Sequence, residues 1–174
     1  MFIFVKLRTQ IIILMKHFLL LFLVPVSLLW AQSPPTTDLI SSLHPELFNL
    51  TKNKVAVEGY DLTSYFSQDK PLKGTEKWKS SYSGVTFYFA NEANKKTFDA
   101  TPEKFIPEFG GWCTYAIGAY DKKVEINPES YTIEDGKLYL FYKTRFNDTR
   151  KKWLNDHQSL KSKAYKNWVG KTNQ

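Results

Sequence analysis

The sequence has a single cysteine, Cys113, and only two methionines, at positions 1 and 15. One thiol excludes an intramolecular disulfide framework and a cysteine-rich zinc module. Because no methionine follows position 15, a thioether copper site in the remaining chain is also excluded. The sequence shows no Ser/His/Asp arrangement, no glycine-rich phosphate loop and no His-Glu-x-x-His helix, so we do not expect a hydrolase.

What is present is an ordinary globular composition with an uneven charge. The 174 residues are 43% hydrophobic and carry a net charge of +7. Residues 32–142 contain 12 lysines and 15 acids, whereas residues 143–174 contain nine Lys or Arg and two acids. The net positive charge that follows residue 31 therefore lies in residues 143–174. This segment could attract an anionic membrane surface or a protein partner. A solvated helix face is the alternative.

Residues 1–31 predict a secretory signal peptide. They contain three basic residues and no acid, and an apolar run from Phe18 to Trp30 precedes Ala31. A basic start, an apolar run and a small residue at its end are typical of a cleaved leader. We expect cleavage after Ala31 and export to the periplasm or the medium. An uncleaved anchor is the alternative, but Lys16 and His17 shorten its apolar run below the roughly 20 residues that a spanning helix needs.

The remaining chain predicts one α+β domain. Residues 32–54 begin with a Ser-Pro-Pro linker composition, so we expect a flexible linker there. Residues 55–170 are enough for a single domain with its own core. Their short, segregated strands and helices favour a short antiparallel sheet with packed helices.

Local signals place the elements of this domain. Hairpins are expected near 77–89 and near 131–142, where Asp135-Gly136 marks a tight turn. Asp61 and Asn91 are predicted to cap helices, the second of which reaches about Ala100. A helical pattern runs from residue 144 to residue 168. Its spacing predicts a packed face formed by Phe146, Trp153, Leu154, Leu160 and Trp168.

Several segments of the chain resemble one protein family. These segments are VEGYDLTSYF (57–66), FYFANEANKKTFDATPEKF (87–105), FGGWCTYA (109–116), DGKLYLFY (135–142) and NW (167–168). In this order they resemble the exported YHS domain-containing proteins of bacteria, over about residues 55–170. The resemblance implies a small α+β unit of a kind that is often described as metal-associated.

The metal-associated members of that family carry cysteines that this chain lacks. In the frame of the resemblance, Asp61 is retained and the cysteine positions are occupied by Ser64, Ala90 and Asn94. None of these three side chains is a soft metal ligand. The resemblance therefore implies the fold without the soft-metal site, and it predicts that these three residues lie near one another and near Asp61.

Cys113 has two interpretations. It follows Gly110-Gly111 and is expected at the first turn of a helix, where the helix dipole favours a reactive thiolate or a metal ligand. The alternative, which we favour, is a small buried side chain between Trp112 and Tyr115. His157 is the candidate second metal ligand, although a histidine on a packed helix face is more often structural.

These observations predict a monomeric binding or accessory module rather than an enzyme. One hypothesis is a weak site for a transition-metal ion or a small ligand around Cys113. Its candidate residues are Cys113, Tyr60, Asp61, Tyr65, Trp112 and Tyr115, although the aromatic members are also typical core residues. The second hypothesis is a redox or catalytic thiol. The third is an interaction protein that contacts an anionic surface through its basic C-terminal helices. No nucleic-acid partner is expected for an exported protein.

Overall fold

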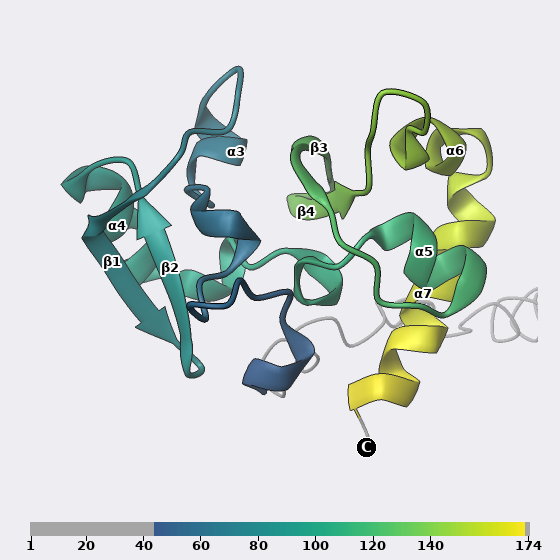
Figure 1. Ribbon diagram of the computed structural model, residues 1–174, viewed down its shortest axis with the longest axis horizontal. Coiled ribbons are helices and arrows are strands. Elements are labelled where there is room, and N and C mark those ends of the chain that lie inside the picture. Colours follow the sequence, from purple (N-terminus) through teal and green to yellow (C-terminus); the bar gives the residue numbers. More distant parts are fainter. Residues whose placement is uncertain (1–43, 173–174) are drawn as a thin grey trace, which may run out of the picture. The chain divides into compact units, whose positions relative to one another are not determined.

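The computed structural model describes residues 44–172 (Figure 1). The predicted signal peptide and the first part of the predicted linker, up to residue 43, lie outside the described residues. Within residues 44–172, no helix is long and apolar enough to cross a membrane.

The described chain has the predicted α+β class. Its first half contains η2 (Pro45–Leu47), η3 (Val57–Gly59), α3 (Ser64–Ser67), β1 (Thr75–Tyr82), β2 (Val85–Phe89), α4 (Glu92–Ala100) and η4 (Pro102–Lys104). Its second half contains η5 (Glu108–Gly111), α5 (Thr114–Tyr120), β3 (Asn127–Glu134), β4 (Lys137–Phe141), α6 (Thr149–Asn155) and α7 (His157–Thr172). Both predicted hairpins are present, and each forms an antiparallel two-stranded sheet of its own.

The first hairpin packs on the helix that follows it. Strand β2 alternates buried and half-buried residues, so Phe87 and Phe89 face the core. Helix α4 begins as predicted, because the Asn91 side chain accepts a hydrogen bond from the backbone N–H of Asn94 at 2.8 Å. Phe98 is the buried residue of α4, and its ring centroid lies 5.1 Å from that of Phe87 and 4.9 Å from that of Phe89.

The second hairpin is built in a similar way. Asp135 and Gly136 form the predicted turn with φ values of 53° and 73°, which suit a two-residue hairpin connection. Strand β4 is fully buried from Leu138 to Phe141. The ring centroid of Trp153 in α6 lies 5.9 Å from that of Phe141. Helices α5 and α7 also pack closely, because a Cβ added at Gly118 would lie 2.6 Å from a backbone oxygen of α7.

The helical pattern predicted from residue 144 to residue 168 is partly wrong. Its Trp153, Leu160 and Trp168 are buried as expected. Phe146, however, is 92% exposed and Leu154 is 54% exposed. Phe146 is exposed because it lies in the loop before α6, which begins only at Thr149. The chain then leaves helical geometry at residue 156, so one periodicity does not describe both helices.

The packed region begins before the predicted boundary at residue 55. Leu47 and Phe48 are buried. The backbone oxygen of Leu47 accepts a hydrogen bond from Trp112 Nε1 at 2.8 Å. Gly110 has a φ of +61°, and a Cβ there would lie 2.4 Å from the same oxygen of Leu47. The segment from residue 47 is therefore part of the core. Val55 and Ala56 form isolated bridges with Thr86 and Leu50.

Candidate functional site

Asp61 organises the region that the resemblance associates with metal binding. Its side chain is fully buried and accepts four hydrogen bonds. Oδ1 accepts from the backbone N–H of Thr63 at 2.9 Å and from the Thr63 hydroxyl at 2.7 Å. Oδ2 accepts from the backbone N–H of Ala90 at 2.9 Å and from Asn94 Nδ2 at 2.7 Å. Asp61 thus joins the segment before α3 to the junction between β2 and α4.

The three positions that correspond to cysteines all contact Asp61, as predicted. Ala90 and Asn94 donate to its carboxylate, and the Ser64 hydroxyl donates to its backbone oxygen at 2.6 Å. We call Asp61, Thr63, Ser64, Ala90 and Asn94 the Asp61 cluster. The predicted helix cap is different in detail, since α3 begins at Ser64 after Thr63 and the Asp61 side chain closes a turn ahead of it.

The Asp61 cluster does not fit a transition-metal ion. Both carboxylate oxygens already accept two hydrogen bonds, Ala90 offers no side-chain donor atom, and Asn94 turns its NH₂ group toward Asp61. The Ser64 hydroxyl is also engaged, because it accepts from the backbone N–H of Leu72 at 2.8 Å. Across residues 44–172, no three His, Cys, Asp or Glu side chains gather in a group that could hold a metal ion.

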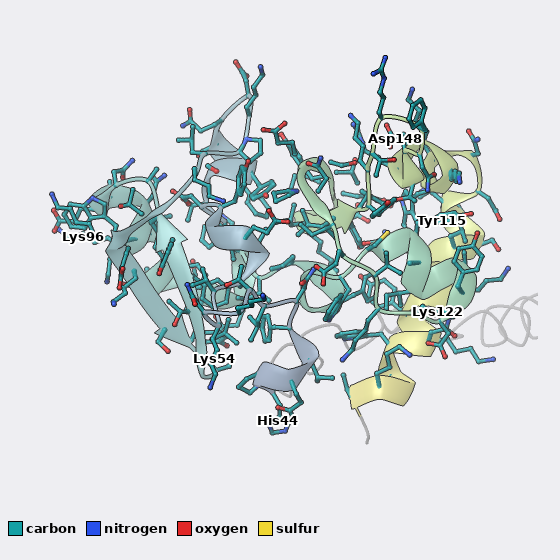
Figure 2. All side chains as sticks on the ribbon, viewed as in Figure 1. His44, Lys54, Lys96, Tyr115, Lys122 and Asp148 are labelled. Atoms are coloured by element: carbon teal, nitrogen blue, oxygen red, sulfur yellow. The ribbon has the colours of Figure 1, made fainter. Side chains whose placement is uncertain are left out.

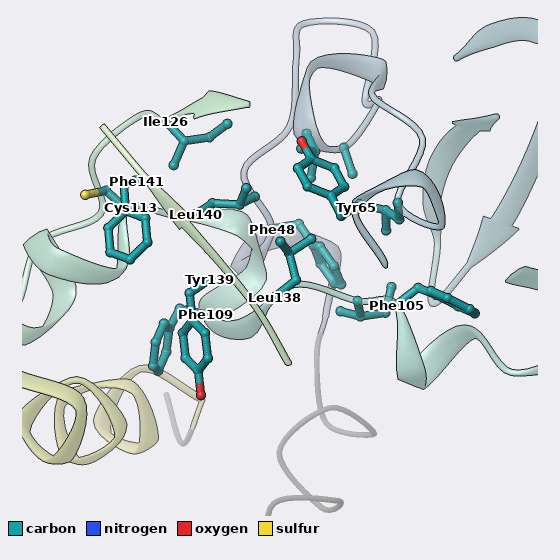
Figure 3. Packing of buried hydrophobic residues seen from close by; sticks show 14 of the residues in the cluster. Phe48, Tyr65, Phe105, Phe109, Cys113, Ile126, Leu138, Tyr139, Leu140 and Phe141 are labelled. Carbon is teal, nitrogen blue, oxygen red and sulfur yellow. The ribbon is translucent and has the colours of Figure 1, made fainter. Parts of the chain in front are cut away.

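Cys113 is fully buried, as the favoured interpretation predicted (Figure 3). Its sulfur accepts a hydrogen bond from the backbone N–H of Tyr142 at 3.3 Å and lies 3.4 Å from the Thr149 hydroxyl. These polar partners come from the two ends of the loop that joins β4 to α6. The half-buried Trp112 and Tyr115, named as its enclosing neighbours, make their polar contacts with Leu47 and Tyr120 instead. Cys113 therefore connects the start of α5 to the base of a loop.

The second predicted metal ligand, His157, has other partners. Its Nε2 lies 3.4 Å from the carboxylate of Glu134, and its ring lies 6.4 Å from that of Trp153. The imidazole therefore lies beside the ion pair between Lys161 and Glu134, at the start of α7. Together with the absence of a metal-type cluster in residues 44–172, this leaves Cys113 and His157 without a shared site.

The tyrosine candidates are held by structural contacts. Tyr65 donates its hydroxyl hydrogen to the backbone oxygen of Pro128 at 2.9 Å, and its ring meets that of Tyr131 edge-on at 4.9 Å. Burial raises the pKa of Tyr65 well above its usual range. Tyr60 is half-buried beneath the ammonium of Lys73, which lies 4.5 Å from the ring centroid. Burial, followed by the charge of Glu129, raises the pKa of Tyr60. Both phenols are therefore neutral at pH 7.

Comparison with known proteins identifies part of this chain. A family model for the YHS domain matches residues 63–108. The chain is a YHS domain-containing protein. The match begins two residues after Asp61 and includes its partners Thr63, Ser64, Ala90 and Asn94, whereas Cys113 and the second hairpin follow it. No curated protein and no solved structure matches the chain.

A hollow lies between the β1–β2 hairpin and residues 53–55. Its volume is about 410 Å³. It is lined by Asn53, Val55, Glu76, Lys79, Ser80, Ser81, Thr86 and Tyr88. None of the ligand or metal candidates named in the sequence analysis lines this hollow.

The loop between β4 and α6 is a feature that the sequence analysis missed. We call residues 143–148 the tip loop. The backbone N–H of Thr144 donates to the oxygen of Asn147 at 2.8 Å, so Arg145 and Phe146 lie at the end of a closed turn. The guanidinium carbon of Arg145 lies 5.7 Å from the Phe146 ring centroid. The Arg-Phe pair was visible in the sequence, but only the start of α6 at Thr149 shows that it lies outside a helix.

Proposed function

We propose that this YHS domain-containing protein is an exported accessory module that binds an anionic partner through its basic C-terminal segment, residues 143–172. The observation that carries this proposal is the number of free cations. Among the described residues of the segment, three of the nine Lys and Arg side chains pair with an acid within 4.0 Å, which leaves six. These six are all exposed; they are Arg145, Arg150, Lys151, Lys152, Lys163 and Lys166.

The burial of Cys113 and Asp61 favours this surface role over the two other hypotheses, a metal or small-ligand site around Cys113 and a redox or catalytic thiol. The Cys113 sulfur has no exposed surface, so neither a substrate nor an oxidant reaches it in the folded protein. The carboxylate of Asp61 is fully hydrogen-bonded within the protein. Both residues therefore serve the fold, whereas the unpaired cations remain available to a partner.

A salt-dependent binding experiment tests the proposal. The probe is immobilised dextran sulfate, and the variant is Lys151→Glu/Lys152→Glu, which reverses two exposed charges on α6. The control is Lys52→Glu/Lys70→Glu, which changes the net charge equally at exposed positions outside the segment. We expect the α6 variant to elute at clearly lower salt than the control, because local charge density determines binding to a polyanion. Equal elution of both variants, or no retention of the natural protein, would contradict the proposal.

A metal and thiol measurement tests the structural roles assigned to the buried groups. Protein isolated after export should contain less than one metal ion per chain, and Cys113 should react slowly with an alkylating reagent until the protein is denatured. A stoichiometric metal that is lost in Cys113→Ser would instead support a metal site at this thiol.

Export itself is part of the proposal and has its own test. The basic start, the apolar run and the small Ala31 motivate cleavage after residue 31. The mass of the exported protein should therefore correspond to a chain that begins at Gln32. An intact Met1 in that protein would refute cleavage.

A further inference from the structure

We propose that the tip loop is a membrane-docking element, in which Phe146 inserts among the headgroups of an anionic lipid bilayer while the neighbouring cations contact lipid phosphates. This inference rests on the proposed function and names its anionic partner. Its first support is the exposure of Phe146, which is 92%. The other eight phenylalanines of the described chain are buried or half-buried. The fold thus makes no use of the Phe146 ring, which is free to bury its apolar surface elsewhere.

The second support is that hydrogen bonds hold the tip loop in one conformation. Besides the contact between Thr144 and Asn147, residues 143 and 148 form an antiparallel bridge. The Thr149 hydroxyl donates to the backbone oxygen of Tyr142 at 2.7 Å. Below this closure, the Cys113 sulfur contacts both Tyr142 and Thr149. Because the loop is ordered before it meets a partner, docking loses little conformational entropy.

The third support is the charge around the ring. Residues 143–154 contain five Lys or Arg and one acid, which gives a net charge of five minus one, or +4. The acid, Asp148, accepts hydrogen bonds from the backbone N–H groups of Arg150 and Lys151 at the start of α6. It also lies 3.9 Å from the ammonium of Lys143. Figure 2 shows Asp148 at this loop, where neighbouring side chains extend away from the ribbon.

These features favour a lipid surface over an acidic protein. A stable protein interface typically covers about 800 Å² on each partner. The tip loop instead offers a single aromatic ring at the end of a turn, surrounded by cations. Aromatic rings at headgroup level and basic residues near anionic lipids are a combination that membrane surfaces bind.

The test measures binding of the exported protein to vesicles of phosphatidylglycerol and phosphatidylcholine, with pure phosphatidylcholine vesicles as the neutral reference. The variant is Phe146→Ala, and the matched control is Tyr120→Ala, which removes an aromatic ring that is 61% exposed at the end of α5. We expect Phe146→Ala to bind the anionic vesicles about tenfold more weakly, as for the loss of a partly inserted phenylalanine. Tyr120→Ala should bind like the natural protein. Phe146→Ala should retain the natural melting temperature because its ring is exposed, and Tyr120→Ala should change it little because the ring contacts Tyr115 only at the surface.

A second measurement reports the position of the loop directly. Phe146→Cys and Tyr120→Cys are each labelled with a polarity-sensitive dye, which should spare the buried Cys113. Anionic vesicles should increase the fluorescence of the dye at position 146 and leave the dye at position 120 unchanged. An equal response at both positions would overturn insertion by the tip loop.

The outcomes separate this inference from the proposed function. Salt-dependent vesicle binding that Phe146→Ala does not weaken would overturn the docking role of the ring and leave the basic segment as the binding surface. Binding to dextran sulfate without binding to anionic vesicles would overturn the lipid partner and point to an acidic macromolecule. Failure to bind either probe would overturn both proposals.

Discussion

Two buried polar groups join distant segments of this chain, one just before the matched YHS domain and one beyond its end. Asp61 accepts four hydrogen bonds at 2.7–2.9 Å and links residues 61–63 to residues 90–94. Cys113 has two polar contacts at 3.3–3.4 Å and links α5 to the ends of the tip loop. Hydrogen bonds to a charged acceptor are stronger than those to a thiol. Both groups therefore connect segments that are distant in the sequence, but the hydrogen bonds of Asp61 should contribute more to the free energy of unfolding than those of Cys113.

The two hairpins of the fold share a packing pattern. In each half, a hairpin packs its second strand against one large aromatic residue of a following helix. Phe98 of α4 packs on Phe87 and Phe89, and Trp153 of α6 packs near Tyr139 and Phe141.

Removal of the Asp61 carboxylate should have the largest effect. Asp61→Ala leaves four donors without their acceptor, and we expect a loss of about 3–5 kcal/mol in the free energy of unfolding. Urea unfolding followed by circular dichroism measures this loss. Asp69→Ala is the matched control, because Asp69 is an exposed acid on the same segment and should change stability by less than about 0.5 kcal/mol. A small effect of Asp61→Ala would remove the distinction between the two groups.

Loss of one donor to Asp61 should have a smaller effect. Asn94→Ala removes the hydrogen bond from Nδ2 to Asp61 Oδ2 but retains three others. We expect a loss of about 1.5–2 kcal/mol, since this bond is made to a charged group. The same unfolding experiment on Asp61→Ala/Asn94→Ala should show that the two effects do not add. Additive effects would indicate that Asn94 stabilises α4 in another way.

Substitution of Cys113 should have a weaker effect than substitution of Asp61. Cys113→Ala removes packed volume and the acceptor for the Tyr142 N–H, and we expect a loss of about 1–2 kcal/mol. Cys113→Ser should lose less, because its hydroxyl can accept from Tyr142 and contact Thr149. A melting series of both variants measures the order. If the serine variant were the less stable, the apolar contacts of Cys113 would outweigh its polar ones.

The smallest expected effect at neutral pH is that of Tyr65→Phe. It removes the hydrogen bond to Pro128, which typically stabilises a protein by about 0.5–1.5 kcal/mol. Burial raises the pKa of Tyr65 above its unfolded value of 10.0, so its contribution is complete below pH 10 and is lost as the pH rises further. The stability difference between the natural protein and Tyr65→Phe should therefore shrink when urea unfolding is repeated above pH 10. A constant difference would mean that this phenol does not ionise on unfolding.

Features set by neighbouring residues were predictable from the sequence. The Asn91 cap and the Asp135-Gly136 turn depend on residues a few positions apart, and both are present. The resemblance also predicted the proximity of Ser64, Ala90 and Asn94 to Asp61, because it provided a frame for residues about 30 positions apart.

Features that depend on distant contacts were not predictable in this way. The sulfur of Cys113 meets Tyr142 and Thr149 only because β4 and α6 converge on α5. Phe146 was assigned to a core because apolar spacing alone does not show where a helix begins. The hydrogen bonds that Asp148 accepts at the start of α6 determine that boundary, and they leave the phenylalanine outside it.

The burial of Cys113 has a consequence for how the protein folds. The thiol is exposed in the unfolded chain and becomes inaccessible when α5, β4 and α6 come together. Because the chain has no second cysteine, the only disulfide that two copies can form is intermolecular. In an oxidising medium, folding and covalent dimerisation therefore compete for the same sulfur. A chain that folds quickly buries its thiol before it can form a disulfide with a second copy.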